Sequence, residues 1–307
     1  MIEDQTILIT GGTGSLGNAI IPKLAIAKKI IVYSRGEYAQ VEMERKFSKD
    51  EFPSIRYFLG DIRDRDRLYR ALDGVNIVIH CAAIKHVDKA QYDPFEAVKT
   101  NTNGAQNIID AAIDCGVKKV IAISSDKAAN PVSLYGASKL CADFMFIAAS
   151  AYSPHKNQTK FSVIRFGNFW GSSGSIVEIL FKNQNTKIFP ITDKRMTRFF
   201  ITLDCAADYV IDALNIMQGG EIFTPKMVSR KIVDVIKEIC PKAKLKVIGI
   251  RPGEKLHEDL IVKAYAQQTY ETERWYITYP KNCNIECIGI LVKENFEYNS
   301  FIALGDK

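Results

Sequence analysis

Residues 6–17 read Thr6-Ile7-Leu8-Ile9-Thr10-Gly11-Gly12-Thr13-Gly14-Ser15-Leu16-Gly17, an apolar run that ends directly in glycines at positions 11, 14 and 17. The apolar run predicts a buried strand, and the residues after it open a helix. Glycines here let the backbone turn tightly and approach a pyrophosphate, whose charge sits at the helix N-terminus. An ordinary glycine-rich turn is the alternative, but a strand before and a helix after favour a dinucleotide site. The residues expected to contact the cofactor are Gly11, Thr13, Gly14, Ser15, Leu16 and Gly17.

Five further apolar runs follow at intervals that each leave room for a helix. The expected strands cover residues 29–34, 56–60, 75–80, 119–124 and 161–165. Continuous apolar runs separated by helical segments indicate a parallel sheet that is covered on both faces. Six such units predict an α/β protein with a Rossmann-like, doubly wound parallel sheet.

The alternation of strand and helix ends near residue 166, where loops, short helices and aromatic-rich strands begin. We expect residues 1–165 to form the dinucleotide-binding domain. Residues 166–307 should form mainly a smaller substrate-binding lobe at the strand ends, with some segments returning to the first domain. Within this part, residues 274–278 are typical of an edge strand.

Composition narrows the class of protein. The chain has 307 residues, of which 47% are hydrophobic, and it contains no apolar run long enough for a membrane span. The acidic N-terminus excludes a secretory signal. Seven scattered cysteines without a Cys-x-x-Cys pair predict free, buried thiols in the cytoplasm and no metal site. The mild net charge of +6 suits a small anionic ligand better than nucleic acid.

The end of the second strand, Ser34-Arg35-Gly36, bears on the choice of cofactor. Enzymes that use NAD typically place an acidic residue here for the ribose 2′-hydroxyl, whereas an arginine accommodates the 2′-phosphate of NADP. We therefore predict NADP. The alternative is that Arg35 is solvated and Glu37 serves NAD.

Residues after the third and fourth strands should complete the cofactor site. Asp61 and Ile62 are placed to meet the adenine. The small side chains of Ala82 and Ala83 would let the cofactor approach the backbone. Asn101 sits where a helix of this fold commonly bends towards the site.

Two short runs carry the chemistry, Ser125-Asp126-Lys127 and Tyr135-Gly136-Ala137-Ser138-Lys139. The second contains Tyr-x-x-x-Lys, the dyad of short-chain dehydrogenases. A plain dehydrogenase needs a tyrosine base and a hydride acceptor, whereas elimination of water from a neighbouring carbon needs a further acid and base. The sequence thus predicts an enzyme that oxidises, dehydrates and re-reduces one substrate. The alternative is that Asp126 and Lys127 form a loop ion pair with no chemical role.

With these residues in view, the chain resembles extended short-chain dehydrogenases, and specifically UDP-N-acetylglucosamine 4,6-dehydratases, including the 5-inverting type of the pseudaminic acid pathway. The resemblance runs from about residue 5 to about residue 261. Its most specific stretches are residues 85–87, 125–131, 134–140, 195–199, 219–223 and 251–258, the last reading Arg251-Pro252-Gly253-Glu254-Lys255-Leu256-His257-Glu258.

This resemblance implies roles for individual residues. Chemistry would be carried by Asp126, Lys127, Tyr135 and Lys139, beside Ser125, which replaces the usual threonine but keeps its hydroxyl. The implied nucleotide-sugar contacts are Lys85, Asn168, Arg195, Arg198, Arg251 and Glu254. Lys85 is also expected beside the cofactor. The resemblance further implies UDP-N-acetylglucosamine or a related UDP-sugar as substrate, bacterial surface glycan synthesis, and a homo-oligomer, dimeric or larger.

Besides Ser125, the sequence departs from the family pattern at two points. Gly36 stands where the family usually has an acidic residue. After Gly167-Asn168 the family usually has small residues and an arginine, whereas this chain has Phe169-Trp170-Gly171-Ser172-Ser173-Gly174. The second departure changes the shape of the expected pocket.

A mechanism follows as a hypothesis. The charge of Lys139 would lower the pKa of Tyr135, and the tyrosinate would take the proton of the sugar 4-hydroxyl while a hydride passes to NADP⁺. Neutral Lys127 would take the proton from carbon 5, and protonated Asp126 would protonate the departing 6-hydroxyl. The hydride would then return to carbon 6, so the cofactor stays bound. Retaining relatives have a glutamate in place of Lys127, so this lysine favours inversion at carbon 5.

Other functions stay open at this stage. One alternative is a retaining dehydratase of the same fold. Another is a nucleotide-sugar 4-epimerase or reductase, which needs Tyr135 and Lys139 but not the Asp126-Lys127 pair. A non-catalytic NADP-sensing regulator could keep the glycine motif without either pair.

Overall fold

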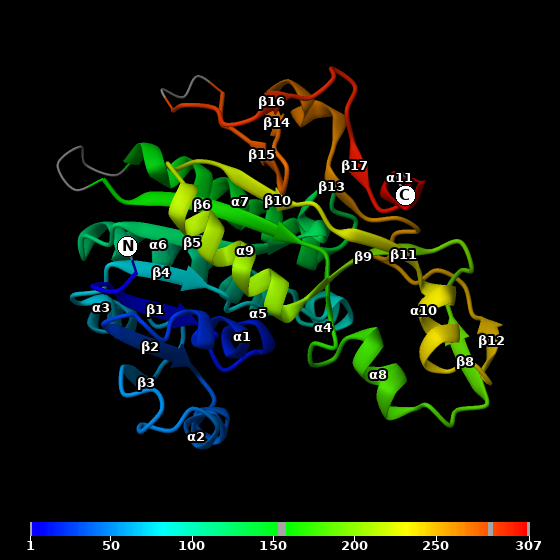
Figure 1. Cartoon of the computed structure of the whole chain (residues 1–307), viewed down its shortest axis with the longest axis horizontal. Coiled ribbons are helices and arrows are strands. Elements are labelled where there is room, and N and C mark those ends of the chain that lie inside the picture. Colours follow the sequence, from blue (N-terminus) through cyan, green and yellow to red (C-terminus); the bar gives the residue numbers. More distant parts are fainter. Residues whose placement is uncertain (1, 153–157, 282–284, 306–307) are drawn as a thin grey trace.

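The computed structural model describes residues 2–152, 158–281 and 285–305. Its centre is a ten-stranded sheet (Figure 1). The strands are β1 (Thr6–Thr10), β2 (Lys29–Ser34), β3 (Ile55–Leu59), β4 (Ile77–His80), β5 (Lys119–Ser125), β6 (Lys160–Phe166), β10 (Ile222–Pro225), β14 (Thr269–Glu271), β15 (Trp275–Thr278) and β16 (Ile290–Leu291). Their order across the sheet is β16-β14-β15-β10-β6-β5-β4-β1-β2-β3.

The first six strands and β10 pair in parallel, so the predicted doubly wound parallel sheet is confirmed. The expectation of an edge strand at residues 274–278 is wrong. β15 pairs with β10 on one side and with β14 on the other, and β16 lies beyond β14. β14 folds back as a hairpin onto β15, which gives β15 a neighbour that its own composition could not reveal.

Helices cover both faces of the sheet. They are α1 (Ser15–Lys23), α2 (Glu37–Lys46), α3 (Arg65–Leu72), α4 (Val87–Tyr92), α5 (Pro94–Val98), the π-helical turn η1 (Lys99–Asn103), α6 (Gly104–Asp114), α7 (Leu134–Tyr152) and α9 (Leu203–Ile216). Successive strand side chains point to opposite faces. Ile7 and Ile9 therefore join the core with α1 and α9, whereas Leu8 joins the core with α3, α6 and α7.

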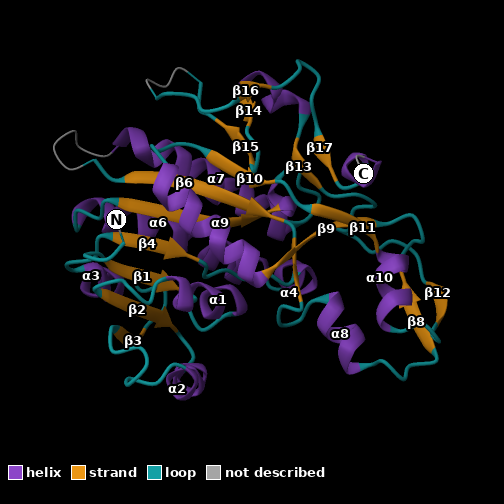
Figure 2. Cartoon of the chain, viewed as in Figure 1, coloured by secondary structure: helices purple, strands orange, loops and turns teal. Residues whose placement is uncertain are grey.

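Residues after β6 also build a smaller lobe beyond the carboxyl ends of the parallel strands (Figure 2). Its elements are β7 (Asn168–Trp170), α8 (Ile176–Lys182), β8 (Ile188–Ile191), β9 (Thr197–Thr202), β11 (Val228–Lys231), α10 (Ile232–Ile239) and β12 (Lys244–Val247). Val177, Phe189 and Val235 belong to its own apolar core.

The end of the chain returns to the junction between sheet and lobe. The elements there are β13 (Asp259–Ile261), the 3₁₀ turn η4 (Lys263–Gln268), β17 (Tyr298–Asn299) and α11 (Ile302–Gly305). β13 and β17 pair antiparallel. This pairing holds the segment before β13 against the functional site described below.

The described cysteines are free, as expected, but most of them are not buried. Of the six in the described residues, all are free and only Cys240 is buried, while Cys141, Cys205 and Cys287 are exposed. Cys141 and Cys205 lie on outward positions of α7 and α9. Among the described helices, none has the length and apolar character needed to span a membrane.

Candidate active site

Two cavities meet at the carboxyl ends of the parallel strands. The larger has a volume of about 810 Å³ and lies over the glycine-rich turn. The smaller, of about 430 Å³, reaches towards the lobe. Lys85, His86 and Phe169 are among the residues that line both. Ligands in open α/β sheets bind at this edge, so the pair of cavities is suited to a cofactor beside a substrate.

The glycine-rich turn is shaped for an anion. Gly11 has φ +62°, and a Cβ atom on it would lie 2.8 Å from the Cα atom of Ala82, so only glycine fits between these strand ends. α1 begins after Gly14 without a side-chain cap, so its first N–H groups are available to a phosphate. The motif residues that line the larger cavity are Gly11, Thr13, Gly14, Ser15, Leu16 and Gly17, with Ala82 and Ala83 opposite.

Ser34, Arg35, Asp61 and Ile62 line the far end of the larger cavity. The Arg35 side chain is 56% exposed, and its Nη1 lies 3.7 Å from Oδ2 of Asp61. Burial opposes ionisation of Asp61, but hydrogen bonds from Arg63 outweigh it and hold the pKa of Asp61 below its usual value. Arg35 is thus a cation at the cavity wall, beside a carboxylate already bound to another arginine.

Asn101 lies behind this cavity and does not line it. Its Oδ1 accepts the N–H of Ile84 at 2.8 Å, and its Nδ2 donates to the carbonyl of Ile84 and to the Ser138 hydroxyl, both at 3.0 Å. The expected bend is present as the π-helical turn η1. Asn101 therefore ties the loop after β4 to α7, and its contact with the cofactor stays a prediction.

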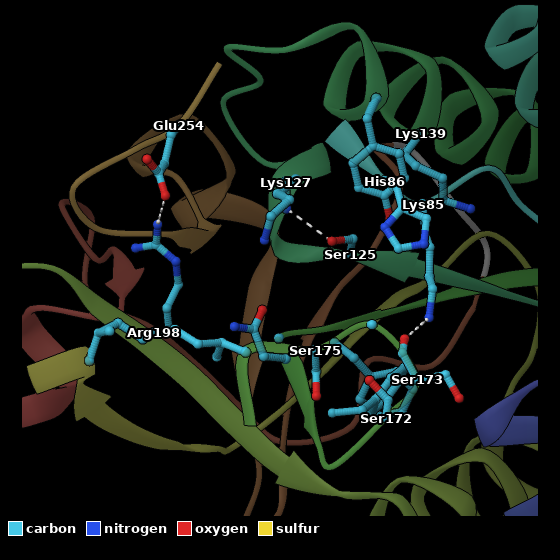
Figure 3. A pocket seen from close by; sticks show the side chains of 18 of the residues that line it. Lys85, His86, Ser125, Lys127, Lys139, Ser172, Ser173, Ser175, Arg198 and Glu254 are labelled. Atoms are coloured by element: carbon cyan, nitrogen blue, oxygen red, sulfur yellow. Dashed lines mark hydrogen bonds and ion pairs between the residues drawn. The ribbon is translucent and has the colours of Figure 1, made fainter. Parts of the chain in front are cut away.

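The catalytic candidates gather where β5 ends and α7 begins. Tyr135 lines the smaller cavity, as do Ser125, Lys127 and Lys139 (Figure 3). The 3₁₀ turn η2 (Asp126–Ala128) packs against α7. A Cβ atom on Gly136 would lie 2.3 Å from the carbonyl oxygen of Lys127. The glycine inside the Tyr-x-x-x-Lys run thus allows the two runs to touch.

Asp126 lies one layer behind the cavity wall and is 1% exposed. Its Oδ1 accepts hydrogen bonds from the Ser125 hydroxyl at 2.9 Å and from Lys127 Nζ at 3.0 Å. Burial alone would lower the pKa of Lys127, but the charges of Asp126 and Glu258 outweigh it and raise that pKa. The protein at rest therefore holds a Lys127 ammonium, whereas the mechanism expected from the sequence starts from neutral Lys127 and protonated Asp126.

Tyr135 and Lys139 also differ electrostatically from expectation. Burial raises the pKa of Tyr135, while a hydrogen bond with Ser125 and the charge of Lys127 act in the opposite direction. Burial lowers the pKa of Lys139, whose Nζ donates to the carbonyl of Ile123 at 2.8 Å. The cation that acts most on Tyr135 here is thus Lys127, where we expected Lys139.

Five of the six expected nucleotide-sugar residues line the smaller cavity, namely Lys85, Asn168, Arg198, Arg251 and Glu254. Glu254 Oε1 lies 4.0 Å from Nη2 of Arg198 and 3.5 Å from Nη2 of Arg251. Arg195 does not line it. Its exposed guanidinium binds the Asp193 carboxylate, with Nη2 2.8 Å from Oδ2, because Arg195 stands in the turn before β9.

The run after Asn168 forms the wall between the cavities. Lys85 Nζ donates to the carbonyl of Ser173 at 2.7 Å, and burial lowers the pKa of Lys85. Phe169 lines both cavities, whereas Trp170 packs edge-on against Phe200 in the lobe. Only the first aromatic residue of this run therefore shapes the site.

One charged residue beside the site was missed by the sequence reasoning. Glu258 is 2% exposed, and its Oε1 lies 3.3 Å from Lys127 Nζ. Glu258 is the last residue of the family-like stretch 251–258, and its membership of that stretch was the signal in the sequence that could have indicated it. Nothing in the spacing of residues indicated that it meets Lys127.

The fold and the site define a dinucleotide-dependent enzyme of the short-chain dehydrogenase type. Residues 7–280 match a protein family described as "Polysaccharide biosynthesis protein", and the chain belongs to this family. It is 46% identical to the UDP-N-acetylglucosamine 4,6-dehydratase (inverting) of Campylobacter jejuni, over 98% of this chain and 93% of the relative.

Two further similarities extend this comparison. The X-ray structure of Pen from Bacillus thuringiensis superposes with a TM-score of 0.90 at 36% identity, covering 98% of this chain and 93% of that one. A UDP-glucose 4-epimerase of Rickettsia canadensis is 36% identical over 85% of this chain and 79% of its own. The resemblance inferred from the sequence is thus confirmed along nearly the whole chain.

Proposed function

We propose that the protein is a UDP-N-acetylglucosamine 4,6-dehydratase that uses NADP and inverts carbon 5. The observation that carries this proposal is the buried Asp126–Lys127 pair, with its nitrogen and oxygen 3.0 Å apart, next to Tyr135 at a cavity adjoining the dinucleotide site. The 46% identical relative bears the name of this activity. An epimerase is the competing candidate because of the 36% identical relative, but epimerisation gives that pair no task.

The larger cavity suits an NADP molecule. The glycine-rich turn and the uncapped start of α1 would hold the pyrophosphate, and Arg35 would bind the 2′-phosphate through charge-assisted hydrogen bonds. When bound, the cofactor would accept a hydride from carbon 4 of the sugar and return it to carbon 6.

The resting ion pair can supply both the acid and the base. If a proton on Lys127 Nζ moves along the hydrogen bond to Asp126 Oδ1, 3.0 Å from that nitrogen, Lys127 becomes a neutral amine and Asp126 a carboxylic acid, with no change in total charge. Lys127 lines the cavity and takes the proton from carbon 5. Asp126 reaches the departing 6-hydroxyl through Ser125, whose hydroxyl contacts Asp126 and also lines the cavity.

Tyr135 takes the proton of the 4-hydroxyl. Its hydrogen bond with Ser125 and the nearby Lys127 charge favour the phenolate, against the burial that disfavours it. Arg198 and Arg251 are the cations that would bind the diphosphate of the substrate, with Glu254 available for ribose hydroxyls. Lys85 would stand between cofactor and sugar.

Two further properties belong to this proposal. Tyr92 and Phe95 are 81% and 78% exposed on α4 and α5, which supports a homo-oligomer that covers them. Exposed free thiols at Cys141 and Cys205 support a location in the reducing cytoplasm.

A direct assay separates the candidate functions. The protein, loaded with NADP⁺, is incubated with UDP-N-acetylglucosamine in deuterated water while ultraviolet absorbance follows the cofactor and NMR follows the sugar. A dehydratase yields a 4-keto-6-deoxy sugar without net formation of NADPH. A product that keeps its 6-hydroxyl would reject the proposal in favour of epimerisation, and no turnover would favour a sensor.

A further inference from the structure

Two buried carboxylates hold the Lys127 ammonium, and the proposed chemistry uses only Asp126. Lys127 Nζ lies 3.0 Å from Asp126 Oδ1 and 3.3 Å from Glu258 Oε1. The second oxygen of Glu258 is buried without a hydrogen-bond partner in the described part of the chain. Burying an ionised carboxylate this deeply is costly unless it is paired with a cation. The pairing of Glu258 with Lys127 therefore indicates that Glu258 has a role at the site.

Charged groups face Glu258 from three elements. Lys127 approaches from η2, Arg198 Nε from β9 at 3.6 Å, and Lys255 Nζ from the segment of Glu258 itself at 4.0 Å. Asp126 is the nearby like charge. Burial raises the pKa of Glu258, whereas the charges of Lys127, Arg198 and Lys255 act in the opposite direction. When the Lys127 proton moves to Asp126, Arg198 and Lys255 still face the Glu258 carboxylate.

The C-terminal part of the chain fixes Glu258 in place. The N–H of Glu258 donates to the Ser300 hydroxyl oxygen at 2.9 Å, and the N–H of Ser300 donates to the Glu258 carbonyl at 2.8 Å. The Ser300 hydroxyl donates in turn to the carbonyl of Thr197 at 3.2 Å. The carboxylate is thus anchored through its backbone before any substrate arrives.

We propose that Glu258 is a positioning residue that fixes the Lys127 nitrogen at the wall of the substrate cavity. The proposal rests on the proposed function, in which that nitrogen must face carbon 5 in both of its charge states. A neutral amine keeps two N–H donors, so Glu258 Oε1 still accepts one of them after Asp126 has taken the proton. Without Glu258, Lys127 loses its second anchor at the moment it acts as a base.

The first test measures Lys127 without any substrate. Glu258→Gln keeps the shape of the side chain but removes its charge, which lowers the pKa of Lys127. A fall of one unit raises the neutral fraction about ten-fold. Acylation by acetic anhydride at mildly alkaline pH, followed by mass spectrometry, should therefore label Lys127 at least about ten-fold faster in the variant.

Two controls isolate this effect. Lys139 lines the same cavity and forms no ion pair within the described residues. Its rate of acylation should stay unchanged, which would show that acetic anhydride enters the cavity equally well in the variant. Asp259→Asn is the matched variant, because Asp259 neighbours Glu258 but pairs with Lys255 at 3.0 Å and not with Lys127. It should leave the acylation of Lys127 as in the natural protein.

The second test is kinetic. Glu258 does not line the cavity, so Glu258→Gln should lower kcat at least about ten-fold and change KM by no more than about three-fold. Glu258→Asp keeps the charge but shortens its reach by one methylene. It should keep Lys127 acylation within about three-fold of the natural protein and still lower kcat.

Each outcome bears on the proposal. Unchanged acylation of Lys127 in Glu258→Gln, with or without loss of activity, would overturn it. If that variant does not fold, Glu258→Asp decides, and a kcat equal to that of the natural protein would overturn the positioning role. Acylation needs no substrate, so it tests Glu258 even if the natural protein fails to dehydrate UDP-N-acetylglucosamine, which would reject the proposed function alone.

Discussion

Arg35→Ala should weaken binding of NADP much more than binding of NAD. The side chain is 56% exposed and reaches the cavity end that would hold the adenosine ribose. A hydrogen bond to a charged group contributes about 1.5–3 kcal/mol, and exposure to water places this one near the lower limit. The affinity for NADP should then fall about ten- to thirty-fold, whereas NAD lacks the 2′-phosphate and should lose no more than about two-fold.

Calorimetric titration of the protein with each cofactor measures both losses on one scale. Arg65→Ala is the matched control, because Arg65 is an exposed arginine on α3 that contacts Tyr69 and does not line the cavity. It should change neither affinity. Equal losses for NADP and NAD in Arg35→Ala would refute the argument for a 2′-phosphate site and favour NAD.

Three further outcomes follow from the site and its core. Asp126→Asn should slow loss of the 6-hydroxyl about a hundred-fold or more yet bind cofactor normally by titration; dehydration at the natural rate would make the pair structural. Gly136→Ala should destabilise the protein by about 1–3 kcal/mol in denaturant unfolding, because its Cβ would lie 2.3 Å from the Lys127 carbonyl oxygen; an unchanged midpoint would contradict this. Burial lowers the pKa of His80 to about 3. At pH values below the pKa of about 6.5 in the unfolded chain, the unfolded state binds more protons, so the free energy of unfolding decreases as the pH decreases. Relative to His80→Asn, the loss should reach about 2 kcal/mol near pH 5, and parallel stability curves would argue against a neutral buried His80.

The parallel sheet could be predicted because its strands carry the signal within themselves. Each strand from β1 to β6 is a continuous apolar run, since both of its faces are buried. β15 was misplaced at an edge because its neighbour β14 is short and polar enough, reading Thr269-Tyr270-Glu271, to escape notice. Pairing with such a strand depends on a turn and on tertiary packing.

The cofactor and catalytic residues were predictable because they lie in short contiguous runs. Glu258 was not, because its contact with Lys127 joins segments from opposite halves of the chain. The different positions of Arg195 and Arg198 could not be predicted from the sequence either. Both belong to one family-like stretch, but β9 begins at Thr197, so the strand directs Arg198 into the site while Arg195 remains in the turn.

The protonation states of Asp126 and Lys127 could not be predicted from the sequence either. Adjacent residues Asp126 and Lys127 are compatible with a neutral pair or an ion pair. Burial opposes the ammonium, but the charge of Asp126 and the second negative charge of Glu258 outweigh it and favour the ion pair. The cation that lowers the pKa of Tyr135 is Lys127, on the turn that follows β5, and this contact between separate runs could not be read from the sequence.

The proposed dehydratase reaction requires an internal redox cycle coupled to proton exchange at carbon 5. UDP-N-acetylglucosamine carrying deuterium at carbon 4 tests the cycle when NMR locates the label in the product formed in ordinary water. We expect the deuterium in the carbon-6 methyl group, while carbon 5 takes its proton from solvent and ring couplings report the L-arabino configuration. A D-xylo first product would contradict inversion by Lys127, and appearance of the carbon-4 label in bulk water would contradict the cycle itself.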